Sequence, residues 1–171
     1  MATQIIPGPV LPNWILVESR SVTAADTTTQ NFTGLDGDAA VLYLARFTFV
    51  HAGAGSVYYT LEPNGLTSNQ FSTRHYGSGA TDAAAATTDL RLVGTSASSQ
   101  IRGQCLIWAT TGVKRSVLVE SMQSSATVVN IEHIGGTWTD TTTNITSLRF
   151  TASVANGIGI DSKIELYEQG V

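Results

Sequence analysis

Three histidines are the side chains of this sequence best suited to metal binding or acid–base chemistry. His51, His75 and His133 lie far apart along the chain, with no HxH or HxxxH spacing and no acidic ligand repeated at a fixed distance. A zinc site needs three or four such ligands at one point. The spacing therefore favours three isolated rings. A metal site assembled from distant strands stays open as the alternative.

Other short motifs that could carry chemistry are incomplete. Asp36-Gly37-Asp38 resembles the start of a calcium loop, but the third oxygen ligand and the distal Glu are missing. We expect a turn there, with a surface Ca²⁺ between loops as the alternative. No GxSxG motif occurs, Gly157-Ile158-Gly159 lacks the third glycine of a dinucleotide site, and the 13 acidic residues are dispersed. The sequence predicts no catalytic residue, no enzyme activity and no cofactor.

Aromatic side chains offer the remaining candidate contacts. Trp14 and Trp108 lie in apolar runs and are predicted to be core residues. Trp138 lies in the segment 135–140, which we expect to be a loop, so core packing and surface contact both remain open. Tyr76 is the other aromatic residue proposed as a surface contact.

The sequence pattern predicts that the elements which position these residues are strands. Apolar and polar side chains alternate with period two along most of the chain, and no segment has a helical stripe. Asp82–Ala86 is predicted to form one helical turn or a loop. The segment 39–50 is apolar on both faces and is predicted to be a central strand covered on both sides. Glu62-Pro63-Asn64-Gly65 predicts a tight turn. About ten short strands without a helical layer favour two packed sheets or a barrel. We predict an all-β, jelly-roll-like antiparallel sandwich over residues 13–171.

The composition excludes several partners. The chain has 171 residues with a net charge of −4, and only 13% of them are charged. The seven arginines are scattered and there are two lysines, so no basic surface for nucleic acid is predicted. No window approaches the roughly 18 apolar residues of a membrane span. Cys105 is the single cysteine and cannot form a disulfide within the chain.

Residues 1–12 are predicted to form an extended arm. Three prolines in twelve residues forbid a helix and a central strand. The arm is either a frayed terminus or a strap docked on a neighbour. Its predicted partner-binding residues are Ile5, Ile6, Pro7, Pro9, Val10 and Leu11. The shortage of lysine also suggests that sheet edges are covered by this arm or by other copies of the chain.

Two stretches resemble a known group of proteins. Gly34–Tyr43, running on to Tyr59–Gly65, and Trp138–Arg149, ending in Gly157–Tyr167, resemble small structural proteins encoded by tailed bacteriophages. Asp161 departs from the pattern, because the family often has a glycine just before the serine that opens the last strand. The resemblance implies a virion component of the capsid cement or decoration kind, without catalytic residues.

The sequence and the resemblance together predict a non-enzymatic capsid decoration protein. It is expected on the capsid surface of a virion after synthesis in the host cytoplasm. The expected partners are the major capsid protein and further copies of the chain, as a homotrimer. The alternative is a tail or fibre module that recognises host surface glycans through Trp138 and Tyr76.

Overall fold

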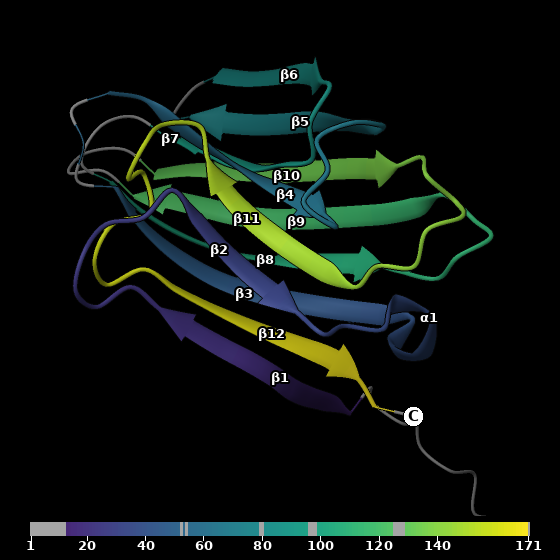
Figure 1. Cartoon of the computed structure of the whole chain (residues 1–171). Helices are drawn as coiled ribbons and strands as arrows, with labels where there is room; N and C mark the ends of the chain where they lie inside the picture. Colours follow the sequence, from purple (N-terminus) through teal and green to yellow (C-terminus); the bar gives the residue numbers. More distant parts are fainter. Residues whose placement is uncertain are drawn as a thin grey trace, which may run out of the picture.

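The computed structural model describes residues 13–51, 53, 55–78, 81–95, 99–124 and 129–170. In these ranges the chain forms two antiparallel β-sheets, of eight and four strands, that pack face to face (Figure 1). The predicted all-β sandwich is therefore confirmed. The arm predicted for residues 1–12 lies outside the described residues. The elements are β1 (Trp14–Ser21), β2 (Thr29–Thr33), α1 (Gly37–Ala40), β3 (Leu42–His51), β4 (Val57–Pro63), β5 (Gln70–Ser78), β6 (Thr81–Thr87), β7 (Arg91–Thr95), β8 (Ser99–Trp108), β9 (Arg115–Ser124), β10 (Val129–Trp138), β11 (Ser147–Ala152) and β12 (Lys163–Gln169).

The strands pair in a nested order. The larger sheet runs β1-β12-β3-β8-β9-β10-β5-β6, and the smaller runs β2-β11-β4-β7. The first strand thus pairs with the last, β2 with β11, β3 with β8 and β4 with β7. This is the pattern of one long hairpin rolled up across two sheets. The hairpins β5–β6 and β9–β10 are insertions into this order, and both widen the larger sheet.

The core lies between the inner faces of the sheets. Phe49 of β3 stacks on Tyr59 of β4 with ring centroids 4.2 Å apart, which joins the two layers. The Tyr59 hydroxyl donates a 2.8 Å hydrogen bond to the Gly157 carbonyl oxygen. Phe32 and Phe150 make an edge-to-face contact within the smaller sheet. Such aromatic pairs contribute about 1 kcal/mol beyond their burial.

Two local predictions are wrong. Asp82–Ala86 belongs to strand β6, because pairing with β5 outweighs the helix preference of alanine. The segment 39–50 begins within helix α1. Strand β3, which follows α1, is fully buried on one face only, and most residues of its other face are half-buried. Its inward residues are buried, whereas Arg46 on the other face is exposed.

The wider sheet extends past the smaller one. We call β9, β10, β5 and β6 the extension. Strand β7 is the edge strand of the smaller sheet, and it contacts β8, β9 and β10 of the larger sheet. The inner face of the extension therefore meets β7. The pocket described below lies at this place.

Candidate functional site

The structure separates the two aromatic residues proposed as surface contacts. Trp138 is the last residue of β10 and only 1% exposed, with the Arg115 guanidinium 4.9 Å from its ring centroid. The expected loop is thus partly strand, and the indole has no surface to offer a partner. Tyr76 on β5 lines a pocket. The partner-binding residues predicted in the arm, Ile5, Ile6, Pro7, Pro9, Val10 and Leu11, lie outside the described residues.

Asp36 and Asp38 stabilise the start of helix α1 and a neighbouring loop, where Asp36 is the N-cap residue. The Asp36 carboxylate accepts hydrogen bonds from the N–H groups of Asp38 and Ala39 and from the Asn144 amide. These bonds lower the pKa of Asp36, that from Asn144 most. Asp38 accepts from the backbone N–H and the hydroxyl of Thr111. Among the described residues, no three or more His, Cys, Asp or Glu side chains are placed to hold a metal ion.

Two of the three histidines meet on the outer face of the larger sheet. His75 of β5 lies opposite His133 of β10, and His133 lies opposite Glu120 of β9. The His133 Nδ1 atom is 3.9 Å from a Glu120 oxygen. His51 is buried and hydrogen-bonds the Gly55 carbonyl through Nε2. The sequence spacing did not indicate the His75–His133 pair, because strand register alone creates it.

Polar side chains of the extension cap the edge of the smaller sheet. Gln70 accepts a hydrogen bond from the Leu90 N–H at 3.3 Å. Ser72 donates to the Asp89 carbonyl oxygen at 2.7 Å, and Ser121 donates to that of Leu92. Glu132 accepts from the Gly94 N–H. The backbone from residue 89 to 94 is therefore bonded by side chains of the facing sheet, which protects an edge that is otherwise open to another strand.

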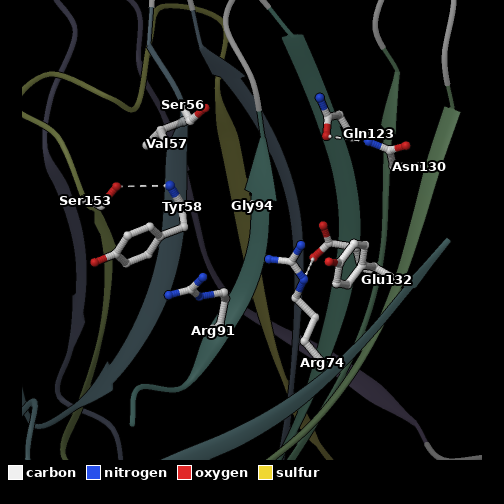
Figure 2. A pocket seen from close by; sticks show the side chains of 11 residues that line it. Ser56, Val57, Tyr58, Arg74, Arg91, Gly94, Gln123, Asn130, Glu132 and Ser153 are labelled. Carbon is white, nitrogen blue, oxygen red and sulfur yellow. Dashed lines mark hydrogen bonds and ion pairs between the residues drawn. The ribbon is translucent and has the colours of Figure 1, made fainter. Parts of the chain in front are cut away.

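A pocket of about 510 Å³ that is lined mainly by polar residues opens beside this capped edge. We call it the arginine pocket. Figure 2 shows side chains from both sheets around it. Its lining residues are Ser56, Val57, Tyr58, Arg74, Tyr76, Arg91, Gly94, Gln123, Asn130, Glu132 and Ser153.

Each arginine of the pocket lies against one tyrosine ring and forms an ion pair with one carboxylate. The Arg74 guanidinium lies 4.2 Å from the Tyr76 ring centroid, and its Nε atom is 3.5 Å from Glu132 Oε2. Arg91 lies 4.1 Å from the Tyr58 ring centroid and pairs with Asp89 at 3.1 Å. Stacking and ion pairing fix the planes of both guanidinium groups. Positioned guanidinium groups can recognise a planar anion.

Glu132 is the buried acid of this cluster. Its side chain is 3% exposed. Burial raises the pKa of Glu132, while Arg74, the Gly94 N–H and Arg91 oppose the rise. Nine buried side-chain polar atoms of the described residues have no hydrogen-bond partner, and five belong to this cluster. These five are on Arg74, Asp89, Arg91, Asn130 and Glu132. Two of the five, Arg74 Nε and Glu132 Oε2, form the 3.5 Å ion pair described above, which leaves the atoms of Asp89, Arg91 and Asn130 as the unpaired ones of the cluster.

A second surface lies on the outer face of the larger sheet. Its exposed apolar side chains, which we call the outer band, are Phe71, Trp108, Leu118, Met122, Val129 and Ile131. The prediction that Trp108 is a core residue is wrong, because this indole is 41% exposed. Phe71, Trp108 and Leu118 surround a shallow depression of about 540 Å³ together with Gly135 and Gly136. Glu120, His133 and His75 lie across this face between Leu118 and Met122, so the outer band consists of two apolar groups. Exposed apolar patches often mark interaction sites.

The chain has no match in any of three comparisons with known proteins: no protein-family model, no curated protein and no solved structure is significantly similar. Among the described residues, no helix has the length and apolar character needed to cross a membrane.

Proposed function

We propose that the chain is a non-enzymatic virion structural protein of the capsid decoration or cement kind. It binds the outside of a phage head shell, with the major capsid protein and further copies of itself as partners. The outer band is the observation that carries this proposal. Six large apolar side chains exposed on one sheet face favour a protein surface as partner over nucleic acid.

The strand order supports the jelly-roll class within this proposal. In a jelly roll a long hairpin is rolled up, so that strands pair first with last and inward from there across two sheets. The nested pairs β1–β12, β2–β11, β3–β8 and β4–β7 follow this rule when the two inserted hairpins are set aside. Jelly rolls are common in viral capsid proteins. This likeness of architecture adds weight without assigning a role by itself.

Low charge also favours a role in assembly. Covering hydroxyl and amide groups at an interface costs less free energy than covering ions. The chain has 13% charged residues, and Gly135 and Thr137 lie beside the outer band, which Glu120 and His133 interrupt between Leu118 and Met122. A homotrimer remains our proposal for the assembled form, with the arm of residues 1–12 as the clamp.

Co-assembly with shells of the major capsid protein from the same genome tests this function. We expect the double variant Leu118→Lys, Ile131→Lys to lower the number of copies per shell at least about tenfold. Both side chains are exposed in the free chain, and the introduced ammonium groups would become buried without partners at the interface with the shell. Val113→Lys is the matched control, since Val113 is exposed in a turn outside the sheet. Unchanged occupancy of the double variant refutes the outer band as the binding surface. A monomer by light scattering refutes the trimer.

A second candidate is a tail or fibre module that recognises host surface glycans. The observation that favours it is the place of Tyr76 in the arginine pocket, beside two arginines and several amide and hydroxyl groups. Saturable binding of a glycan by the isolated chain, lost on changing pocket residues, supports this candidate.

A further inference from the structure

We propose that the arginine pocket binds an acidic saccharide, with the sugar carboxylate held by Arg74 and Arg91. This inference goes beyond the decoration role, because a protein attached to a shell can also carry a glycan site. It names the ligand class for the second candidate function and depends on that candidate. Neutral sugars in the experiment below distinguish failure of the carboxylate assignment from failure of glycan recognition.

The positive groups of the pocket are arranged for a carboxylate. The Arg74 and Arg91 side chains are 18% and 19% exposed, so each keeps donors near the pocket in a partly desolvated setting. The Arg91 Nε atom is buried without a hydrogen-bond partner and the Arg74 Nε atom is 3.5 Å from Glu132 Oε2, so a ligand would bind through other nitrogens of the two guanidinium groups. Charge-assisted hydrogen bonds to a carboxylate are stronger than neutral ones, and a guanidinium fixed by stacking loses less freedom on binding.

The ion pairs within the pocket neutralise its two arginines only in part. Glu132 contacts Arg74 at 3.5 Å, beyond usual hydrogen-bond length, and it also caps the Gly94 N–H. Asp89 contacts Arg91 through one oxygen, while its other oxygen is buried without a partner. The cluster is thus incompletely paired on both its positive and its negative side. A ligand in the pocket can add hydrogen bonds to the exposed parts of these side chains.

The remaining wall of the pocket suits hydroxyl groups. Gln123 and Asn130 are joined by a 3.2 Å hydrogen bond, and the Asn130 Oδ1 atom has no donor. Ser153 accepts from the Tyr58 N–H, and its own hydroxyl hydrogen can be donated onward. Amide and hydroxyl groups beside two arginines match a sugar ring that carries a carboxylate. A simple carboxylate offers nothing to this wall.

The size of the pocket agrees with one or two sugar rings. Its volume of about 510 Å³ lies within the range of ordinary small-molecule sites, roughly 300–1,000 Å³. Gly94 keeps the space open, since a Cβ atom there would lie 3.1 Å from Arg74 Nη1 and 3.9 Å from Tyr58 Cβ. The nearest atom is the tip of a flexible side chain, so Gly94→Ala shifts the Arg74 guanidinium without a backbone clash.

Calorimetric titration of the full chain tests the proposal with three kinds of probe. The first kind has both features: methyl glucuronide, methyl galacturonide and N-acetylneuraminic acid. The second is methyl glucoside, which has hydroxyls alone, and the third is acetate, which has a carboxylate alone. We expect at least one acidic sugar to bind at least about tenfold more tightly than methyl glucoside and acetate.

Three variants locate the binding. Arg91→Gln and Gly94→Ala are expected to weaken the acidic sugar at least about tenfold while thermal unfolding shows an intact fold. Arg102→Gln removes the same charge from the exposed outer face and is expected to leave the affinity unchanged.

Several results overturn the proposal. If no acidic sugar of the panel saturates the protein below about 20 mM, the pocket is not a saccharide site. Equal affinity for methyl glucoside and methyl glucuronide refutes the carboxylate assignment and leaves glycan recognition standing. An affinity that Arg91→Gln does not change places the ligand elsewhere.

Discussion

Gln70 is the side chain whose replacement most directly tests how the smaller sheet is protected. It is 2% exposed, its Oε1 accepts from the Leu90 N–H at 3.3 Å, and its Nε2 donates to the Leu66 carbonyl oxygen at 2.6 Å. Gln70→Met keeps the length of the side chain and removes both bonds. Leu90 is buried, so its N–H group is left without a partner and costs about 1–3 kcal/mol.

The net effect is smaller than the sum of both bonds. Leu66 is exposed, so water can replace the lost donor to its carbonyl oxygen. Burying the Met side chain in place of the amide returns part of the loss. We therefore expect the free energy of unfolding to fall by about 1–2 kcal/mol.

Urea denaturation of the wild type and the variant measures this difference. Gln104→Met is the control, because Gln104 is exposed on the outer face and its amide donates a hydrogen bond to the exposed Glu120 carboxylate. A loss that does not exceed that of the control means that the cap contributes nothing to stability. The capped-edge interpretation of the fold is then wrong.

Three further substitutions test other parts of the structure. Burial raises the pKa of Glu132, so the folded state binds more protons than the unfolded state above the ordinary carboxyl range, and stability falls as pH rises through that window. Glu132→Gln should flatten this slope in urea denaturation series between about pH 4 and pH 7. Arg115 is 1% exposed and donates to the Ala109, Asp140 and Thr143 carbonyls, so Arg115→Met should cost about 3 kcal/mol or more in thermal unfolding. A loss under about 1 kcal/mol contradicts this role. Val41 has φ 59°, which is strained for a β-branched residue, so Val41→Gly should keep or raise the melting temperature despite losing its side chain.

The fold class could be predicted from the sequence, because the alternation of side chains and the turn residues both indicate strands. β9 alternates buried and exposed residues along its whole length, as period two predicts. The turn predicted at 62–65 is confirmed by the 3.1 Å hydrogen bond from the Gly65 N–H to the Glu62 carbonyl oxygen. Such features depend on neighbours in the chain, and they can be read without knowing which strands pair.

The arginine pocket could not be predicted in this way. Tyr58, Arg74, Arg91 and Glu132 come from β4, β5, β7 and β10, and only the pairing order and register bring them together. One signal was present in β5, where Gln70, Ser72 and Arg74 alternate with Phe71 and Thr73. The polar set faces inward and the set with Phe71 faces solvent, which is the reverse of the usual assignment. Period two shows that two faces differ, but it does not show which one is covered.

The inward-facing polar side chains of β5 also change the explanation of the low lysine content. The scarcity of lysine suggested that sheet edges are covered by the arm or by other copies of the chain. At β7 the cover comes from the same chain, through Gln70, Ser72, Ser121 and Glu132, so this edge needs no partner. The proposed association is therefore supported by exposed apolar side chains and not by open sheet edges.

Strand β1 illustrates the difference. It is an edge strand of the larger sheet, and its register against β12 shifts between Leu16 and Glu18. A bulge of this kind disrupts the regular ladder that another strand would extend. Yet Ile15, Leu16 and Val17 are all exposed, on both faces of the strand. The chemistry of this edge favours packing of apolar side chains against a neighbour over addition of a strand, which is also what the outer band offers. The proposed association through both surfaces would then depend on shape and apolar area, and we expect it to respond weakly to salt.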